Sequence, residues 1–422
     1  MSETEIEAVW YIRLPHNWAN TPEWMSFSRL REIEACPRRW SLNAASYPEI
    51  WSRRGYPPKI YLAPLTGQII HAALETITNA LNRAGCISVT DEHFVRVMRE
   101  LGGYTKIVKE TIKNICNNLQ ENPRFTDKSN YISTKLHTSV PALREQLQIL
   151  TGKLRLQGGF GTSVASGSKS NRGGARSALS NGTYSEIELR VDQLRWRGFV
   201  DALALSDASC ELVDYKTGAL KPEHEEQVRL YSLLWARDAQ LNPTGRIADS
   251  LTLAYSTTDV AVEPPTSSQL AALEQEFISR TKIALGLAQQ TPPSAVPNIN
   301  NCGYCPVRQL CDDYWTPQVQ QTLAQEIMRE SLAASEYLID LQVDNLEQQA
   351  PLSWSAVVLL CRVLPARSQV LIRLSESTPL LQNIFSKGTR IRILDALLID
   401  QPEADVTITS VHLTKMSEAF IV

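Results

Sequence analysis

The stretch GFVDALALSDASCELVDYKTG, residues 198–218, carries Asp201, Asp214 and Lys216 at a spacing that could bring them together. Two short apolar segments flank a Ser-Asp-Ala-Ser turn, and this pattern predicts a β-hairpin. If the turn is centred on its Asp-Ala step, Asp201 lies directly opposite Asp214. Lys216 then shares a face with Asp214, because side chains alternate along a strand. Opposed carboxylates repel each other, and a divalent cation such as Mg²⁺ or Mn²⁺ would offset that repulsion. An exposed hairpin with a surface ion pair is the alternative interpretation.

Three cysteines form a second compact pattern, C-x2-C-x5-C, at Cys302, Cys305 and Cys311. Soft thiolates select zinc or iron–sulfur clusters. A tetrahedral site needs a fourth ligand, and Cys36, in the segment ACPRRW, is the candidate. Zinc sites more often have two close cysteine pairs, which this pattern lacks. An ordinary buried thiol is the alternative for Cys36.

Two predicted helices carry further polar side chains. The first covers residues 66–84 and places His71 beside an apolar stripe. The second follows the hairpin, over about residues 221–240, and places Gln227 and Tyr231 four residues apart on one face. Taken alone, His71 could be a structural histidine, and the Gln227–Tyr231 pair could belong to an ordinary amphipathic helix.

The elements around these residues indicate a mixed α/β protein. Strands are expected over residues 184–216 and 250–257, with helices before, between and after them. Residues 158–183 are rich in Gly, Ser and Asn and carry three basic residues and no acid, which predicts a flexible insertion. A mobile basic flap over a nucleic acid is the alternative. The last part, residues 349–422, reads as short strands of a small all-β domain, joined through a connecting helix over residues 317–348.

Composition excludes several classes of protein. The 422 residues carry 42 Lys and Arg against 45 Asp and Glu, a net charge of −3, which excludes a histone-like protein that coats nucleic acid through bulk charge. No apolar run approaches the roughly 20 residues that span a bilayer. The acidic first residues, MSETEIEAVW, do not form a signal peptide, so a reducing, cytoplasmic location is expected, in which clustered cysteines point to metal.

The ordered set of motifs resembles the RecB-like nucleases of the PD-(D/E)XK superfamily. The resemblance is greatest to members with an iron–sulfur cluster: the CRISPR-associated single-strand exonuclease, the AddB nuclease domain and exonuclease V. The family order is S-x-S…CP, G-x3-H, G-x2-D, D-x-K, Q-x3-Y and C-x2-C-x5-C. The matching residues here are Ser26, Ser28, Cys36, Pro37, Gly67, His71, Gly198, Asp201, Asp214, Lys216, Gln227, Tyr231, Cys302, Cys305 and Cys311.

The resemblance implies a fold and a set of roles. The fold is a mixed sheet flanked by helices, with a helical insertion. The implied ligands of the catalytic Mg²⁺ or Mn²⁺ are His71, Asp201, Asp214 and the backbone carbonyl of Tyr215. Lys216 would orient the attacking water or stabilise charge in the transition state. Gln227 and Tyr231 would position the substrate strand.

The resemblance also implies a further catalytic acid and a cluster. Glu188, in EIELRV, matches the acid, and Glu186 fits almost as well. The four cysteines Cys36, Cys302, Cys305 and Cys311 would hold a [4Fe-4S] cluster as a structural staple.

The implied activity is that of a metal-dependent DNA exonuclease that acts on single-stranded ends, in DNA repair, recombination or phage defence. Residues 1–316 would be the nuclease domain, and residues 349–422 an OB-like or partner-docking domain. The chain has no Gly-x4-Gly-Lys-Ser/Thr loop, so a nuclease subunit with a separate helicase or ATPase partner is one alternative. A non-catalytic iron–sulfur protein that binds DNA ends and a zinc-binding module are two others.

Overall fold

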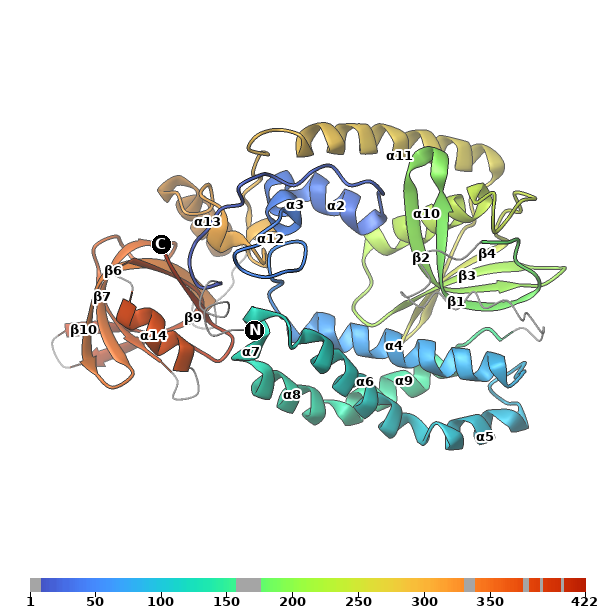
Figure 1. The fold of residues 1–422 in the computed structure, drawn as a ribbon, viewed down its shortest axis with the longest axis horizontal. Coiled ribbons are helices and arrows are strands. Elements are labelled where there is room, and N and C mark those ends of the chain that lie inside the picture. Colours follow the sequence, from blue (N-terminus) through green and yellow to red (C-terminus); the bar gives the residue numbers. More distant parts are fainter. Residues whose placement is uncertain (1–8, 157–175, 330–337, 375–378, 388–389, 404–405) are drawn as a thin grey trace.

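The computed structural model describes residues 9–156, 176–329, 338–374, 379–387, 390–403 and 406–422. It confirms the prediction of a mixed α/β fold with a β-rich C-terminal region, and the two parts lie side by side (Figure 1). Among the helices described, none combines the length and the apolar character needed to span a bilayer.

A five-stranded sheet is the scaffold of the first part. Its order is β1-β2-β3-β4-β5, and neighbouring strands are antiparallel except for the parallel pair of β3 and β4. The parallel pair requires a crossover, and α10 provides it. The bounds are β1 (Gly182–Val191), the 3₁₀ turn η1 (Asp192–Leu194), β2 (Trp196–Leu205), β3 (Cys210–Lys216), α10 (Pro222–Arg237), β4 (Ser250–Tyr255) and β5 (Asp259–Val262).

Pairing between β2 and β3 has the register predicted for the hairpin. The last pair of the ladder, Ala202 and Val213, lies one step before Asp201 and Asp214. Beyond this point β2 is bonded to the segment at Met25, whose carbonyl accepts a hydrogen bond from the N–H of Arg197 (3.0 Å). The two strands therefore separate where the two aspartates lie, and this separation leaves room for a site between them.

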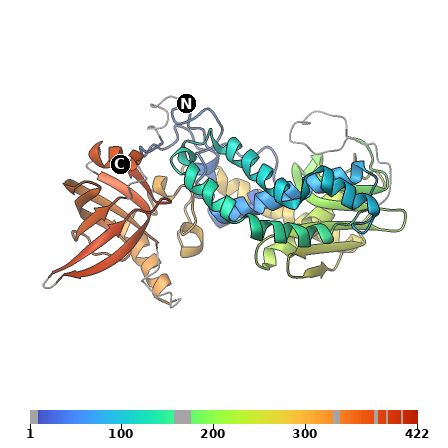
Figure 2. The same cartoon turned by 90° about the horizontal axis from the view of Figure 1, so that it is seen from below.

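Helices cover both faces of the sheet (Figures 1 and 2). One face packs against α10, α11 and α2 around a core that includes Trp196, Leu233 and Phe277. The other face packs against α4, which rests on a helical bundle, around a core that includes Ile70 and Leu147. The bounds are α2 (Phe27–Ala35), α3 (Pro37–Ala44), α4 (Leu62–Arg83), α5 (Glu92–Glu100), α6 (Gly103–Leu119), α7 (Pro123–Thr126), α8 (Ser129–Thr138), α9 (Val140–Gly152) and α11 (Ser267–Ala288).

The start of the helix that carries His71 differs from the prediction, and most of the predicted insertion lies outside the described residues. The helix that carries His71 begins at Leu62 rather than at Thr66, and the Thr66 hydroxyl donates to the carbonyl of Ala63 (2.7 Å) inside the helix. Most of the insertion predicted at residues 158–183 lies outside the described residues, and its last two residues already belong to β1.

The connecting helix predicted over residues 317–348 is wrong in its second half. Helix α13 (Pro317–Arg329) is followed by strand β6 (Leu338–Ala350). In β6 the apolar residues Ile339, Leu341 and Val343 are buried at every second position, which is the period of a strand. Short segments connect the two parts of the chain, namely α12 (Ile299–Cys302) and the 3₁₀ turn η2 (Arg308–Leu310).

The C-terminal strands pair around a closed circuit. The order is β10-β8-β7-β6-β9, β9 also pairs with β10, and β11 adds to β9. The prediction of an all-β region misses one helix, α14, which lies between β8 and β9. The bounds are β7 (Ser353–Cys361), β8 (Gln369–Arg373), α14 (Pro379–Lys387), β9 (Arg390–Glu403), β10 (Val406–His412) and β11 (Glu418–Ile421).

Buried charges join the C-terminal strands to the first part. Glu418 of β11, which has no exposed surface, accepts hydrogen bonds from Arg124 (3.0 Å to Nε) and Lys128 (2.8 Å). Arg308, in the cysteine-rich loop, donates to Asp340 of β6 (2.5 Å) and to Asp395 of β9 (2.5 Å). Such pairs cost stability when one partner is removed, so they fix how the two parts meet.

Candidate active site and cysteine pocket

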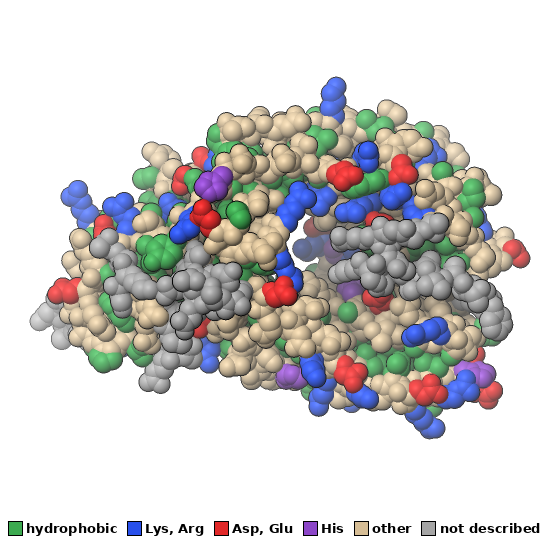
Figure 3. Space-filling model, viewed as in Figure 1, with side chains coloured by type: hydrophobic (Ala, Val, Ile, Leu, Met, Phe, Trp, Pro, Cys, Tyr) green, Lys and Arg blue, Asp and Glu red, His purple; other side chains and the backbone are tan. Residues whose placement is uncertain are grey.

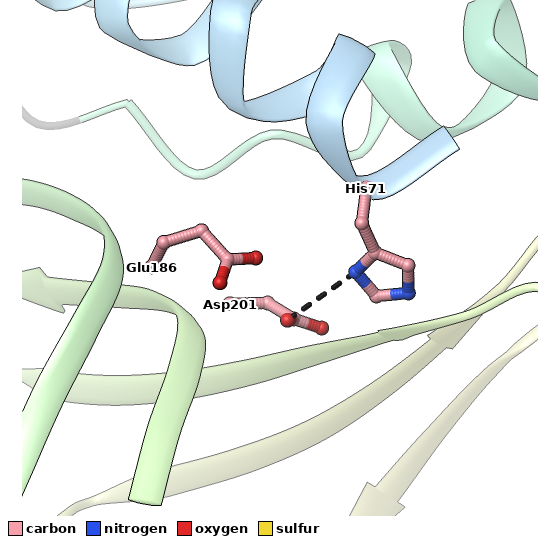
Figure 4. Close-up of side chains that lie close together, drawn as sticks. All are labelled: His71, Glu186 and Asp201. Carbon is pink, nitrogen blue, oxygen red and sulfur yellow. Dashed lines mark ion pairs between the residues drawn. The ribbon is translucent and has the colours of Figure 1, made fainter. Parts of the chain in front are cut away.

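Three side chains from three elements meet where β2 leaves β3. His71 comes from α4, Glu186 from β1 and Asp201 from β2 (Figure 4). One ligand atom from each lies within 4.8 Å of the other two, and His71 Nδ1 lies 3.4 Å from Asp201 Oδ1. All three side chains are partly buried. An imidazole and two carboxylates at this spacing are a suitable set of ligands for one divalent cation.

Negative charge is crowded at this group. Burial and the charge of Asp201 raise the pKa of Glu186 to about 8. Burial also raises the pKa of Asp214, with the Asp201 charge adding to the effect, to about 7. Burial lowers the pKa of His71, but the nearby carboxylates, Asp201 first, outweigh it and raise the value to about 9. The raised pKa values of Glu186, Asp214 and His71 all mean that each group holds its proton more tightly than usual. A bound cation would relieve the same crowding of negative charge.

The glutamate that joins the site is Glu186, and Glu188 lies away from it. The Glu188 carboxylate instead faces Arg197 at 3.6 Å. Glu186 has a positive φ of 50°, in the left-handed region that a non-glycine residue seldom adopts. The strand changes face there: Ser185 contacts Asn79 of α4, whereas Ile187 packs in the core on the α10 side. Of the two acids that the sequence offered, the structure therefore brings Glu186 to His71 and Asp201.

Lys216 is held beside this group by two polar partners. Its Nζ lies 2.5 Å from Asp214 Oδ2 and 2.8 Å from Gln227 Oε1. Gln227 in turn donates to the Tyr231 hydroxyl (2.7 Å). Gln227 and Tyr231, which were predicted to share one face of this helix, thus hold the Lys216 ammonium in place from α10. Tyr231 is almost fully buried, so it supports Gln227 from the core.

Asp214 and Tyr215 reach the site in different ways. Asp214 is 3% exposed and pairs with Lys216. Its negative charge also helps to raise the pKa of His71. Tyr215 takes part through its backbone, because its N–H donates to Asp201 Oδ2 (2.6 Å), while its ring lies in the core next to α4. This hydrogen bond fixes the Asp201 carboxylate and leaves its Oδ1 facing His71.

Two glycines allow the surrounding elements to approach closely. A Cβ at residue 198 would lie 2.7 Å from Cε1 of Tyr231, which is closer than real Cβ contacts. A Cβ at residue 67 would lie 3.1 Å from the hydroxyl of Thr217, the residue after Lys216. Gly198 therefore lets α10 pack onto β2, and Gly67 lets α4 pack near the end of β3.

The four predicted cysteines line a single pocket. Cys36 lies between α2 and α3, and Cys302, Cys305 and Cys311 surround the loop of α12 and η2. The two segments are joined directly, since the Asn301 side chain donates to the carbonyl of Ala35 (2.7 Å). Burial raises the pKa of the Cys302 thiol to about 11 and that of Cys305 and Cys311 to about 12.

The spacing of these sulfurs is wider than the spacing in the carboxylate group. Within the part of the chain that the structure describes, no three of the four cysteine sulfurs all lie within 4.8 Å of one another. A zinc ion binds thiolates at about 2.3 Å, which would bring the sulfurs to roughly 3.8 Å from one another.

Two further features surround the predicted site residues. Glu75, one turn after His71 on α4, adds its charge to the surroundings of Glu186. Near the middle of the molecule the surface is hollowed, and Lys and Arg side chains gather around the hollow (Figure 3). No local sequence pattern signals this hollow, because its walls come from distant segments.

A comparison with protein-family models identifies the family of this chain. No match to a curated protein is found. Among solved structures, one titled "Crystal structure of SSO0001" is 15% identical over 46% of this chain and 82% of that chain, with a TM-score of 0.22. The family model described as the PD-(D/E)XK nuclease superfamily matches residues 24–312, which include every residue of the candidate active site and all four pocket cysteines. The chain therefore belongs to the PD-(D/E)XK nuclease superfamily.

Proposed function

We propose that the protein is a metal-dependent exonuclease that hydrolyses phosphodiester bonds at single-stranded DNA ends. The observation that carries this proposal is the meeting of His71, Glu186 and Asp201 within 4.8 Å, with the ammonium of Lys216 on the adjoining strand. Ligands for a cation and a fixed positive charge are the two requirements for hydrolysing a phosphodiester with this kind of site.

Each residue of the site has a proposed task. A bound Mg²⁺ or Mn²⁺ ion would lower the pKa of a coordinated water and neutralise charge on the phosphate oxygens. His71, Glu186 and Asp201 are its proposed ligands, together with Asp214 and the backbone carbonyl of Tyr215. Lys216 is placed by Asp214 and Gln227 to stabilise the negative charge that develops on the phosphate.

The hollow in Figure 3 supports a single-stranded substrate. Its Lys and Arg side chains attract a phosphate backbone. We propose that a free strand end enters this hollow and that the scissile phosphate reaches the ligand group.

The test compares linear and circular single-stranded DNA in Mn²⁺, with labels at the 5′ or the 3′ end of the linear strand. An exonuclease degrades the linear strand and spares the circle, and the label gives its polarity. Lys216→Ala is expected to lower the rate by about 100-fold or more, the loss typical of removing one transition-state donor. Cleavage of the circle at the rate of the linear strand would indicate an endonuclease. A Lys216→Ala rate equal to the wild-type rate would contradict the proposed site.

We also propose that Cys36, Cys302, Cys305 and Cys311 hold a [4Fe-4S] cluster. One observation supports it: all four cysteines line a single pocket. The group would tie the start of the superfamily region to its end, as a metal couples to folding. Anaerobically purified protein is expected to contain iron and acid-labile sulfide, and Cys36→Ser to contain less of both. Zinc with no iron would contradict the cluster.

The C-terminal strands support a second proposal, a separate module for nucleic acid or a partner. Five strands close into a circuit with α14 between the third and the fourth, which resembles the five-stranded barrel of OB-folds. The given sequence contains no Gly-x4-Gly-Lys-Ser/Thr loop, and we propose a separate helicase or ATPase as the partner. A copurifying ATPase would favour a subunit of a repair, recombination or defence complex over a stand-alone exonuclease.

A further inference from the structure

One face of β1 and β2 continues from the ligand group into a strip of polar and aromatic side chains. Ile187, Leu189 and Val191 of β1 pack in the core on the α10 side, as do Trp196 and Val200 of β2. The residues between them lie on the other face. Pairing along the two strands places Glu188 opposite Phe199 and Arg190 opposite Arg197. Next in the same series come Glu186 and Asp201, the two carboxylates of the ligand group.

Phe199 is the unusual member of this strip. Its side chain is 45% exposed, although it lies two residues from Asp201 and is surrounded by charged positions. Two residues along a strand cover about 6.8 Å. The ring therefore lies about one nucleotide away from the ligand group, on the face where Asp201 lies.

Positive charge gathers beyond Phe199. Arg190 and Arg197 are a directly opposed pair of like charges, which is unfavourable in a sheet. Glu188 and Asp192 offset this in part, at 3.6 Å from Arg197 and 2.8 Å from Arg190.

Two arginines from outside the sheet add to this charge. The start of α2 lies beside β2, where Met25 bonds to Arg197, and this brings Arg29 close. Burial lowers the pKa of the Arg29 guanidinium, and the charges of Arg197 and Arg54 lower it further. The positive charges of Arg29, Arg197 and Arg54 are thus near enough to act on one another, and such a group favours a bound anion.

We propose that Phe199, Arg197, Arg29 and Arg54 form a nucleotide-binding strip for single-stranded DNA. One base stacks on the Phe199 ring, and the arginines bind the phosphates of the neighbouring nucleotides. This inference deepens the proposed nuclease function and rests on it. It gives a physical reason for strand selection, because a base in a duplex is paired and stacked, and cannot also cover the ring.

A binding measurement tests the strip without any chemistry. Binding of a fluorescent oligo(dT) is followed by anisotropy in EDTA, with the full-length protein. Phe199→Ala is expected to bind about 5- to 100-fold more weakly, the range for one base–aromatic stack, and Phe199→Tyr to bind like wild type. Ile283→Ala, on the exposed surface of α11, is the matched control and is expected to leave binding unchanged. Arg54→Gln is expected to remove about one phosphate contact. The slope of log binding constant against log salt concentration should then become shallower by about 0.7.

A cleavage measurement locates the stacked base. In Mn²⁺, strands that carry one abasic nucleotide should make the wild type pause at one fixed distance from the lesion. Phe199→Ala should cleave more slowly overall. It should also show no such pause, because without the ring a missing base removes no stacking interaction. Unchanged binding in Phe199→Ala, or a pause that persists in it, would overturn the strip. If the wild type binds but cleaves nothing, the nuclease proposal fails, and the binding data alone decide the strip.

Discussion

Crowded negative charge is the property that defines the candidate metal site. Glu186→Gln removes one of the carboxylates, so the metal-free protein is expected to melt at a higher temperature than wild type. The same change removes a ligand, and the rise in melting temperature that saturating Mn²⁺ gives the wild type should largely vanish. Glu188→Gln, which changes a carboxylate outside the ligand group, should keep that rise. Equal Mn²⁺ responses in both variants would place the site elsewhere.

The pKa shifts at this site predict how stability depends on pH. The folded protein keeps protons on Glu186 and Asp214 up to about pH 8 and about pH 7, whereas the unfolded chain releases them near pH 4.5 and 3.8. Stability therefore falls as pH rises through this window, because the unfolded state binds fewer protons. In EDTA, the melting temperature should fall between pH 5 and pH 8, and Asp201→Asn should flatten the trend. A wild-type melting temperature that rises over this range would contradict it.

The choice between Glu186 and Glu188 shows where sequence reasoning at the residue scale ends. Both positions have the same parity in β1, so strict alternation places both on one face. Their position along the strand separates them, because the pairing of β1 with β2 sets Glu186 across from Asp201 and Glu188 across from Phe199, and the letters EIELRV do not specify this pairing. By contrast, the sequence could predict that His71 lies near Asp201 and that Asp214 lies beside Lys216, since their motifs occur in the family order.

At the scale of elements, close packing of α10 on β2 is what places Lys216. Gly198→Ala would put a methyl group 2.7 Å from Tyr231 and 3.1 Å from Leu234. Overpacking of this kind costs about 1–3 kcal/mol and should move α10, and Gln227 with it, away from Lys216. Gly218→Ala is the matched control, because its methyl group would meet no atom within 4 Å. The measurements are the free energy of unfolding and kcat. Equal losses in the two variants would show that packing at Gly198 is unimportant.

Elements with a local signal could be predicted, and elements defined by distant contacts could not. The β2–β3 hairpin has its register encoded in a short turn, and the structure reproduces it. The helix expected over residues 317–348 fails because its second half, LQVDNLEQQA with the preceding LID, packs as a strand. The alternation of apolar residues typical of a strand is present in this sequence. The segment becomes a strand because it pairs with β7 and β9, which lie later in the chain.

At the scale of the whole molecule, a buried ion pair connects the cysteine loop to the C-terminal strands. Asp340 is 3% exposed, and it accepts hydrogen bonds from Arg308 and from the Tyr314 hydroxyl (2.7 Å). Asp340→Asn leaves the buried Arg308 with Asp395 as its remaining close carboxylate and should cost about 3 kcal/mol of unfolding free energy. Asp344→Asn, on the same strand but in a more exposed pair with Arg390, should cost about 1 kcal/mol or less. Chemical denaturation of both variants checks this, and equal costs would contradict a structural role for the buried pair.

The most direct test of the account is single-turnover cleavage of a short single-stranded DNA in saturating Mn²⁺ by three proteins. They are the wild type, Asp201→Asn in the ligand group, and Asp207→Asn in the turn of the same hairpin. The account predicts that Asp201→Asn lowers the cleavage rate by about 100-fold or more, while Asp207→Asn stays within about two-fold of wild type. Cleavage by Asp201→Asn at the wild-type rate would contradict the claim that this group is the site of metal-dependent phosphodiester hydrolysis.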